Sequence, residues 1–164
     1  MLTLTLFRLI RPYQWNKNLF LFAALVFSRY LFEMAYFLPV LAGFFLFSLA
    51  SSATYIFNDI RDIDSDREHP QKRLRPLASG KISIKTAAAL TVLLCLVALG
   101  GAFLLDFSFG IIVCIYTLLN ISYSVILKNI VILDVMCIAA GFVLRVIGGA
   151  EIISIPPSNW LIVC

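Results

Sequence analysis

Long apolar stretches separated by short polar segments dominate the chain. Uncharged windows run from Met34 to Asn58, from Thr86 to Leu105 and from Phe107 to Leu127. Each has close to the ~20 residues that a helix needs to cross the hydrocarbon core of a bilayer. The pattern therefore predicts three membrane-spanning helices, at 34–58, 86–105 and 107–127.

Two further stretches have the length of a span but carry charge. One covers about 15–32 and contains Arg29, and the other covers 130–150 and contains Asp134 and Arg145. We predict a helix in each. Asp134 and Arg145 are eleven residues apart, close to three turns, so they share one helix face. Charges inside a span are candidates for function, and internal pairing with other helices is the alternative.

The C-terminal segment resembles the beginning of another helix. Ser158 to Cys164 follow Pro156 and Pro157, and seven residues cannot cross a bilayer. We therefore expect an all-α, multi-span integral membrane bundle with five full helices and the start of a sixth. Residues 1–164 are expected to form a single membrane domain that is partial at its C-terminus.

The composition excludes two classes of protein. Apolar residues make up 62% of the chain and charged residues 13%, whereas soluble domains are roughly half apolar and a quarter charged. Fourteen phenylalanines also exclude intrinsic disorder, because disordered segments are poor in aromatics. The four cysteines lie in apolar stretches without CxxC spacing, so we interpret them as packing residues.

The distribution of charge predicts an orientation. Thirteen Lys and Arg against nine Asp and Glu give a net charge of +4. The basic residues lie between apolar runs, so the positive-inside rule explains them better than nucleic-acid binding does. Eleven of the thirteen fall before the first helix, in the loop at 59–85 or after the fourth helix. We expect the N-terminus and this loop to lie on the cytoplasmic side of the plasma membrane, with membrane lipid around the helices.

An acidic motif opens the loop at 59–85. If the preceding helix continues, Asp59, Asp62 and Asp66 fall at i, i+3 and i+7 on one face, with Asn58 beside Asp62. Carboxylates so placed repel each other, and acids contribute little to topology. Mg²⁺ prefers oxygen ligands and often bridges carboxylates to substrate phosphates. The spacing therefore predicts a site for Mg²⁺ and a diphosphate.

A basic cluster follows the acids. Lys72, Arg73 and Arg75 lie next to Pro70 and Pro76, which favour a turn. Arginine offers a bidentate fork and lysine a point charge, and both suit phosphate oxygens. The alternative is that the three cations only set topology and bind anionic lipid headgroups. His69 is interpreted as a loop residue rather than a general base.

These motifs resemble those of a known superfamily. Asn58-Asp59-x-x-Asp62-x-x-x-Asp66, followed by Lys72-Arg73-x-Arg75-Pro76, is similar to the first aspartate-rich signature of the UbiA superfamily of intramembrane prenyltransferases. Within it, the segment from Arg11 to Asn18 and Tyr123-Ser124-x-x-Leu127-Lys128 look most like the decaprenyl-phosphate phosphoribosyltransferase branch. The resemblance extends through Gly141-Phe142-x-Leu144-Arg145 and Gly148-Gly149.

The resemblance implies nine membrane helices around a central cavity, with the aspartate motif at its cytoplasmic mouth. It implies that Asp59, Asp62 and Asp66 are catalytic and hold Mg²⁺, and that Asn58 orients the site. The implied role of Lys72, Arg73 and Arg75 is contact with phosphates.

Three further residues are expected at the same mouth. Lys17 and Lys128 either join the pocket or extend to the interface from helix ends. Tyr123 either donates a hydrogen bond to a phosphate or belongs to the aromatic belt.

The implied reaction moves a 5-phosphoribosyl group from phosphoribosyl pyrophosphate to a polyprenyl phosphate and releases pyrophosphate, in a pathway to cell-wall arabinan precursors. One alternative is transfer of an isoprenyl group from its diphosphate to an aromatic acceptor. A second is a non-catalytic transporter or lipid-binding protein. Superfamily members carry a second polar signature in their C-terminal half, so we expect little activity from a chain of this length alone.

Overall fold

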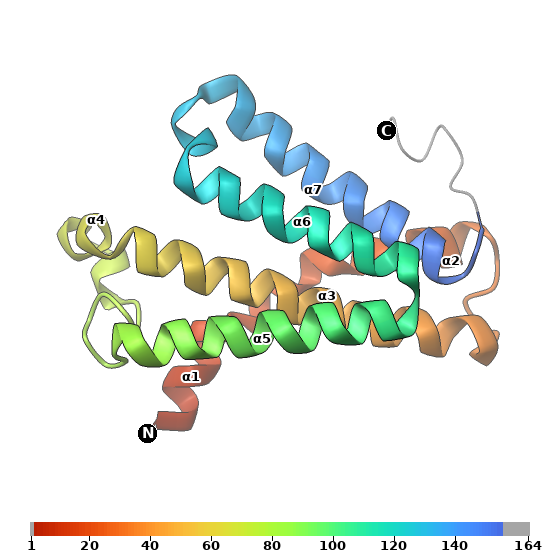
Figure 1. The fold of residues 1–164 in the computed structure, drawn as a ribbon, viewed down its shortest axis with the longest axis horizontal. Helices are drawn as coiled ribbons and strands as arrows, with labels where there is room; N and C mark the ends of the chain where they lie inside the picture. Colours follow the sequence, from red (N-terminus) through yellow and green to blue (C-terminus); the bar gives the residue numbers. More distant parts are fainter. Residues whose placement is uncertain (1, 156–164) are drawn as a thin grey trace.

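The computed structural model describes residues 2–155, and its regular structure over that range is entirely helical (Figure 1). The elements are, in order, α1 (Leu2–Ile10), the 3₁₀ helix η1 (Pro12–Phe22), α2 (Ala23–Phe27), α3 (Met34–Arg61), α4 (Ile63–Glu68), η2 (Lys72–Leu74), α5 (Ile84–Leu105), α6 (Phe107–Val125), η3 (Leu127–Asn129) and α7 (Val131–Ile152). Four helices, α3, α5, α6 and α7, are long and apolar enough to cross a membrane. The prediction of an all-α, multi-span membrane bundle is confirmed.

The helix predicted at 15–32 is wrong in form. The chain instead forms η1 and the short α2, which ends at Phe27. The form agrees with the spacing of the side chains that face the bundle. Trp15, Asn18 and Leu21 recur every three residues, the period of a 3₁₀ helix. Asn18 and Leu21 are fully buried, and the Trp15 indole donates to the Ser52 hydroxyl at 3.0 Å.

The segment formed by η1 and α2 still runs alongside α3. At about 2.0 Å per residue for a 3₁₀ helix and 1.5 Å for an α-helix, it extends about 30 Å, the thickness of a hydrocarbon core. Asn18 donates to the Ser48 hydroxyl at 2.9 Å. Further along η1, the ring of Phe22 lies 6.0 Å from that of Phe37. The register is antiparallel, so within residues 2–155 this segment and the four long helices connect the two ends of the bundle.

Helix α3 lies at the centre of the bundle and contacts η1, α1, α5, α6 and α7 (Figure 1). Its middle, from Ser48 to Thr54, consists of small residues except for Leu49, and the small ones are buried. Small side chains let neighbouring helices approach closely. The hydroxyls of Ser52 and Thr54 donate to the carbonyls of Ser48 and Ser51, both at 2.8 Å. These bonds satisfy polar groups that have no access to water inside a bilayer.

A single residue, Asp106, separates α5 from α6. Its extended backbone ends α5, and its carboxylate accepts from the backbone N–H of Phe109 at 2.7 Å. A carboxylate at this position satisfies one of the unpaired N–H groups at the start of a helix. The Ser83 hydroxyl accepts from the N–H of Thr86 at 3.1 Å in the same way and starts α5.

The two ends of the bundle differ in charge. Figure 1 shows the α5–α6 turn, α2 and the end of α7 at one end, and α4 with its flanking loop at the other. The first end carries Arg29, Glu33, Asp106 and Glu151, and the second carries the loop at 59–85 with its acids and most of the cations. This segregation matches the predicted alternation of helices across a membrane.

Parts of the predicted layout differ in detail or lie outside the described residues. The loop at 59–85 contains the end of α3, all of α4 and the 3₁₀ turn η2. The expected beginning of a sixth helix at 158–164 lies outside the described residues, as does Cys164. The other three cysteines are free and partly buried, as expected for packing residues.

A close contact between α7 and η1 gives a test of this packing. A Cβ atom at Gly149 would collide with the backbone carbonyl of Leu21, whereas one at Gly100 would meet no atom within 4 Å. We expect Gly149→Ala to lower stability by about 1–3 kcal/mol, as overpacking does. Gly100→Ala should leave stability unchanged or raise it, because alanine favours helix. Thermal unfolding in detergent measures both, and equal melting temperatures for the two variants would contradict the packing.

Candidate functional site

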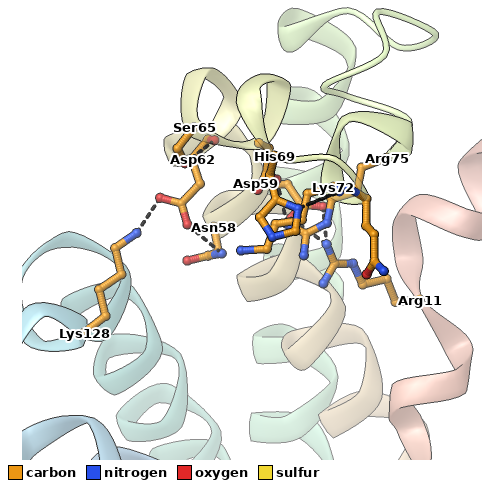
Figure 2. A network of polar contacts seen from close by, with 11 residues as sticks. Arg11, Asn58, Asp59, Asp62, Ser65, His69, Lys72, Arg75 and Lys128 are labelled. Atoms are coloured by element: carbon orange, nitrogen blue, oxygen red, sulfur yellow. Dashed lines mark hydrogen bonds and ion pairs between the residues drawn. The ribbon is translucent and has the colours of Figure 1, made fainter. Parts of the chain in front are cut away.

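The buried centre of the site is Asp59, in the last turn of α3, with a side chain only 2% exposed. Arg11 donates through Nη2 to both of its carboxylate oxygens, at 2.6 and 2.7 Å. Arg11 lies between α1 and η1 with φ 56°, in the left-handed region that non-glycine residues seldom adopt. This backbone conformation turns the chain and brings the guanidinium to the end of α3 (Figure 2).

A second arginine joins Asp59 to Asp66. Nη1 of Arg75 donates to Asp59 Oδ1 at 3.1 Å and to Asp66 Oδ2 at 2.6 Å. Asp66 lies on α4 and is almost as buried as Asp59. One cationic nitrogen thus connects α3, α4 and the segment that follows η2.

The third acid faces a different neighbour. Asp62 lies between α3 and α4, and its carboxylate accepts from Lys128 Nζ and, at 3.2 Å, from Asn58 Nδ2. Lys128 belongs to η3, between α6 and α7, so this pair joins the far side of the bundle to the motif (Figure 2). Asn58 therefore lies beside Asp62, as the helical spacing predicts.

The predicted acids are brought together in two groups. Asp59 and Asp66 share Arg75, while Asp62 turns to Lys128, because the helix breaks at Asp62. Within residues 2–155, no three acidic, histidine or cysteine side chains form a ready metal site. The donor set nevertheless fits Mg²⁺. Its oxygens are the hard ligands that Mg²⁺ prefers, and two carboxylates already share one cationic atom.

The other two predicted cations of the loop are exposed. Lys72 and Arg73 lie on η2, and no ion pair joins either of them to the acids in the part of the chain that the structure describes. His69 accepts through Nδ1 from the backbone N–H groups of Gln71 and Lys72, at 3.2 and 3.3 Å. It therefore orders the loop, in agreement with its interpretation as a loop residue.

A cavity of about 240 Å³ lies between η1, α3, α6 and α7. Its lining includes two of the predicted residues, Lys17 and Tyr123, together with Tyr55, one turn before Asp59. The Tyr123 hydroxyl donates to Asp134 at 2.8 Å. The cavity thus adjoins the acidic cluster from the membrane side.

Arg145 also lines this cavity and is 4% exposed. It donates to Asn18 Oδ1 at 2.8 Å, to the Gly141 carbonyl at 2.6 Å and to the Tyr116 hydroxyl at 3.1 Å. Arg145 and Asp134 therefore both bind tyrosines of α6, which confirms that they share one face of α7.

Sequence reasoning missed several residues of the site. Arg11 is 48 residues from Asp59, and Asn18 is 127 residues from Arg145. No local spacing reveals such pairs. One signal was available in the sequence. An acid at the end of a membrane helix needs a cationic partner, and Arg11 is one of the few cations close to a predicted helix end.

Four apolar spans, a cluster of carboxylates and cations at one end, and an adjoining polar cavity define an integral membrane protein with a site at the membrane interface. The chain belongs to the UbiA prenyltransferase family, which matches residues 18–164. This confirms the resemblance that the aspartate motif indicated.

Curated relatives cover nearly the whole chain. The decaprenyl-phosphate phosphoribosyltransferase of Mycobacterium tuberculosis is 34% identical over 158 residues, covering 93% of this chain and 52% of that protein. The protein of the same name from Mycolicibacterium smegmatis is 35% identical over 161 residues, covering 96% and 51%. The chain spans about half the length of these relatives.

A solved structure has the same fold. It is a UbiA homolog from Archaeoglobus fulgidus bound to DMAPP and Mg²⁺, with a TM-score of 0.75 and 22% sequence identity. The match covers 94% of this chain and 56% of that one. The helical arrangement described above is therefore the arrangement of the family.

The shared contact of Arg75 gives a test of the cluster. Arg75→Gln leaves two buried carboxylates facing each other, so we expect a lower melting temperature. Adding Asp66→Asn should restore part of the loss, with a coupling energy of about 0.5–3 kcal/mol in a double-mutant cycle. Arg67→Gln serves as the control, because its ion pair with Asp64 is exposed and such pairs contribute little. Strictly additive effects of the two substitutions would contradict the bridge.

Proposed function

We propose that the protein is an intramembrane, Mg²⁺-dependent transferase that moves a 5-phosphoribosyl group from phosphoribosyl pyrophosphate to a polyprenyl phosphate, with release of pyrophosphate. The observation that carries the proposal is the cluster of three carboxylates and three cations at the mouth of a cavity that itself contains cations. Such a site suits a diphosphate on one side and a second anion on the other. The relatives that match over nine-tenths of the chain support phosphoribosyl transfer.

Each residue of the cluster has a role in this proposal. Asp59, Asp62 and Asp66 hold the metal, directly or through water, and Asn58 keeps Asp62 in place. Bound Mg²⁺ supplies positive charge that neutralises the departing pyrophosphate.

The chain's own cations work on the same charge. Lys72, Arg73 and Arg75 contact phosphate oxygens, and Lys17 and Lys128 add to the positive charge of the mouth. Because the carbon under attack gains cationic character as pyrophosphate leaves, catalysis here is mainly positioning and electrostatic stabilisation.

The alternative is transfer of an isoprenyl group to an aromatic acceptor. The Archaeoglobus fulgidus homolog was solved with DMAPP and Mg²⁺, and DMAPP is an isoprenyl diphosphate. The cavity favours the first proposal, because Lys17 and Arg145 both line it and a phosphate-bearing acceptor suits two cations better than a neutral ring does. A transporter is less well supported, because the acids lie at one end of the bundle rather than at the midplane.

We infer the orientation from charge. The end that contains α4 and η2 carries most of the basic residues, and the positive-inside rule places such an end in the cytoplasm. The donor then reaches the site from the cytoplasm, and the polyprenyl chain lies in the plasma membrane.

A direct assay tests the donor. We expect the native gene product, purified in detergent, to transfer radiolabelled phosphoribosyl from phosphoribosyl pyrophosphate to decaprenyl phosphate in the presence of Mg²⁺, and to stop when the metal is chelated. Release of pyrophosphate and a labelled lipid product measure the reaction. If the protein instead uses an isoprenyl diphosphate with 4-hydroxybenzoate and ignores phosphoribosyl pyrophosphate, the alternative holds.

Neutralising the acids tests their role. We expect Asp62→Asn and Asp59→Asn each to reduce turnover by about 10²–10³-fold, the range for removing one preorganised electrostatic group. Membrane insertion should be unchanged. Asp64→Asn is the matched control, because this acid lies in the same loop but is exposed, and its ion pair within the described residues is with Arg67. Full turnover of Asp62→Asn, or equal losses in the control, would argue against the assignment.

A further inference from the structure

Arg75 holds two carboxylates of the acidic motif with a single nitrogen. Its Nη1 atom lies 3.1 Å from Asp59 Oδ1 and 2.6 Å from Asp66 Oδ2. Both carboxylates are buried, with side chains 2% and 3% exposed. In the proposed function both also hold Mg²⁺. The position between these two oxygens is therefore taken by a cation of the chain itself.

A metal ion shared by the same two oxygens would need that position. Mg²⁺ binds oxygens at about 2.0–2.1 Å, which is closer than Nη1 lies to either of them. The guanidinium and such an ion would also repel each other, and screening of this repulsion is weak in a buried site. Arg75 and the metal therefore compete for Asp59 and Asp66.

Arg11, the other partner of Asp59, is held more firmly. Its Nη2 atom donates to both carboxylate oxygens, at 2.6 and 2.7 Å (Figure 2), and its guanidinium lies 5.8 Å from the centroid of the Tyr55 ring. The side chain of Arg11 is 15% exposed and that of Arg75 is 28% exposed. Of the two arginines, Arg75 has the weaker hold on Asp59 and the better access to solvent.

The backbone at Arg75 is anchored on both sides. The N–H of Arg75 donates to the Lys72 carbonyl at 2.9 Å, and the Arg75 carbonyl accepts from the N–H of Ser79 at 2.9 Å. Leu77, two residues further on, is only 1% exposed. A change of partner by Arg75 would therefore require rotation of its side chain and no movement of the loop.

Phosphate oxygens are the natural second partner for this side chain. Lys72 and Arg73 precede Arg75 on η2 and are exposed, and the proposed function assigns both of them to the diphosphate. A diphosphate at η2 would present acceptor oxygens that suit the guanidinium of Arg75. Buried carboxylates left without a cation are strongly destabilising, so Arg75 can leave them only when another cation takes its place.

We propose that Arg75 is a positioning residue that exchanges partners. It holds Asp59 and Asp66 together until Mg²⁺ arrives with a diphosphate, and it then releases both carboxylates to the metal and binds the phosphates. This rests on the proposed function, in which the same acids hold Mg²⁺. The exchange makes the site selective for the complex of metal and diphosphate over the free ion, because only the complex offers Arg75 new acceptors.

Two titrations of the native gene product in detergent test the exchange without turnover. Mn²⁺ takes the same oxygen ligands as Mg²⁺, and electron paramagnetic resonance follows its binding in the absence of diphosphate. Calorimetry with pyrophosphate in excess Mg²⁺ measures binding of the complex. We expect Arg75→Gln to tighten Mn²⁺ binding by about 10- to 150-fold, the change that corresponds to removal of competing hydrogen bonds to charged groups. The same variant should weaken binding of the pyrophosphate complex by a similar factor.

The opposite signs separate exchange from damage to the fold, since a loosened loop would bind both ligands more weakly. Arg73→Gln is the matched control, because Arg73 lies in the same loop and, within residues 2–155, forms no ion pair with the acids. It should weaken binding of the pyrophosphate complex and leave Mn²⁺ binding unchanged. This control also measures the effect of removing a positive charge from the loop without removing a competitor.

Arg75→Lys keeps the test available if Arg75→Gln fails to fold. We expect it to tighten Mn²⁺ binding less than glutamine does, because lysine keeps the charge and loses the fork. Equal Mn²⁺ affinity of the wild type and both Arg75 variants would overturn the proposal. An equal gain in Arg73→Gln, or weaker binding of both ligands by Arg75→Gln, would overturn it as well.

Displacement of bound pyrophosphate by phosphoribosyl pyrophosphate distinguishes this inference from the proposed function. If both titrations respond as expected but phosphoribosyl pyrophosphate does not displace pyrophosphate, the exchange stands and the proposed donor is wrong. If the wild type turns over phosphoribosyl pyrophosphate with Mg²⁺ while both Arg75 variants bind Mn²⁺ as the wild type does, the proposed function stands and the exchange is wrong.

Discussion

Neutralisation of two buried carboxylates is the constraint on which this end of the bundle depends. Asp59 and Asp66 are both removed from solvent, and an unpaired buried charge costs about 3–5 kcal/mol. Arg11 and Arg75 supply the opposite charge, and they come from segments far apart in the chain. The N-terminal turn, the end of α3, α4 and the segment after η2 are therefore held together by one electrostatic requirement, because none of them can move away without exposing a carboxylate to an apolar surrounding.

The same requirement explains local geometry that looks unfavourable by itself. Arg11 adopts a left-handed backbone conformation, which costs of order 1–3 kcal/mol and persists only where the surroundings enforce it. Its bidentate contact with Asp59 provides that enforcement. Lys128 plays a comparable part for Asp62 and brings the connection between α6 and α7 to the motif. The polar network thus closes the mouth of the bundle from two sides, whereas apolar packing around Phe47 and Tyr116 forms its interior.

Hydropathy and spacing predict the parts of this structure that are local. The windows around α3, α5 and α6 follow from length and apolarity, and Asn58 lies beside Asp62 because a helix repeats every 3.6 residues. The 3₁₀ form of η1 is not accessible to a hydropathy window, since it goes with a period of three in the contacts that η1 makes with α3 and α7. The partners of the acids are also beyond local reasoning: 48 residues separate Arg11 from Asp59, and 66 separate Lys128 from Asp62. Only the packing of the helices brings these charges together.

This end of the bundle is positively charged overall although it contains five acids. Eleven Lys and Arg lie at the end of the bundle that contains α4. The acids at this end are Asp59, Asp62, Asp64, Asp66 and Glu68, so the cations exceed the acids by six. Four of these acids, Asp59, Asp62, Asp64 and Asp66, are paired with cations, so they add no net negative charge to the mouth. Arg145, deeper in the cavity, extends the positive potential inward. In a low-dielectric surrounding this field is weakly screened, so the positive potential extends from the loop to the cavity.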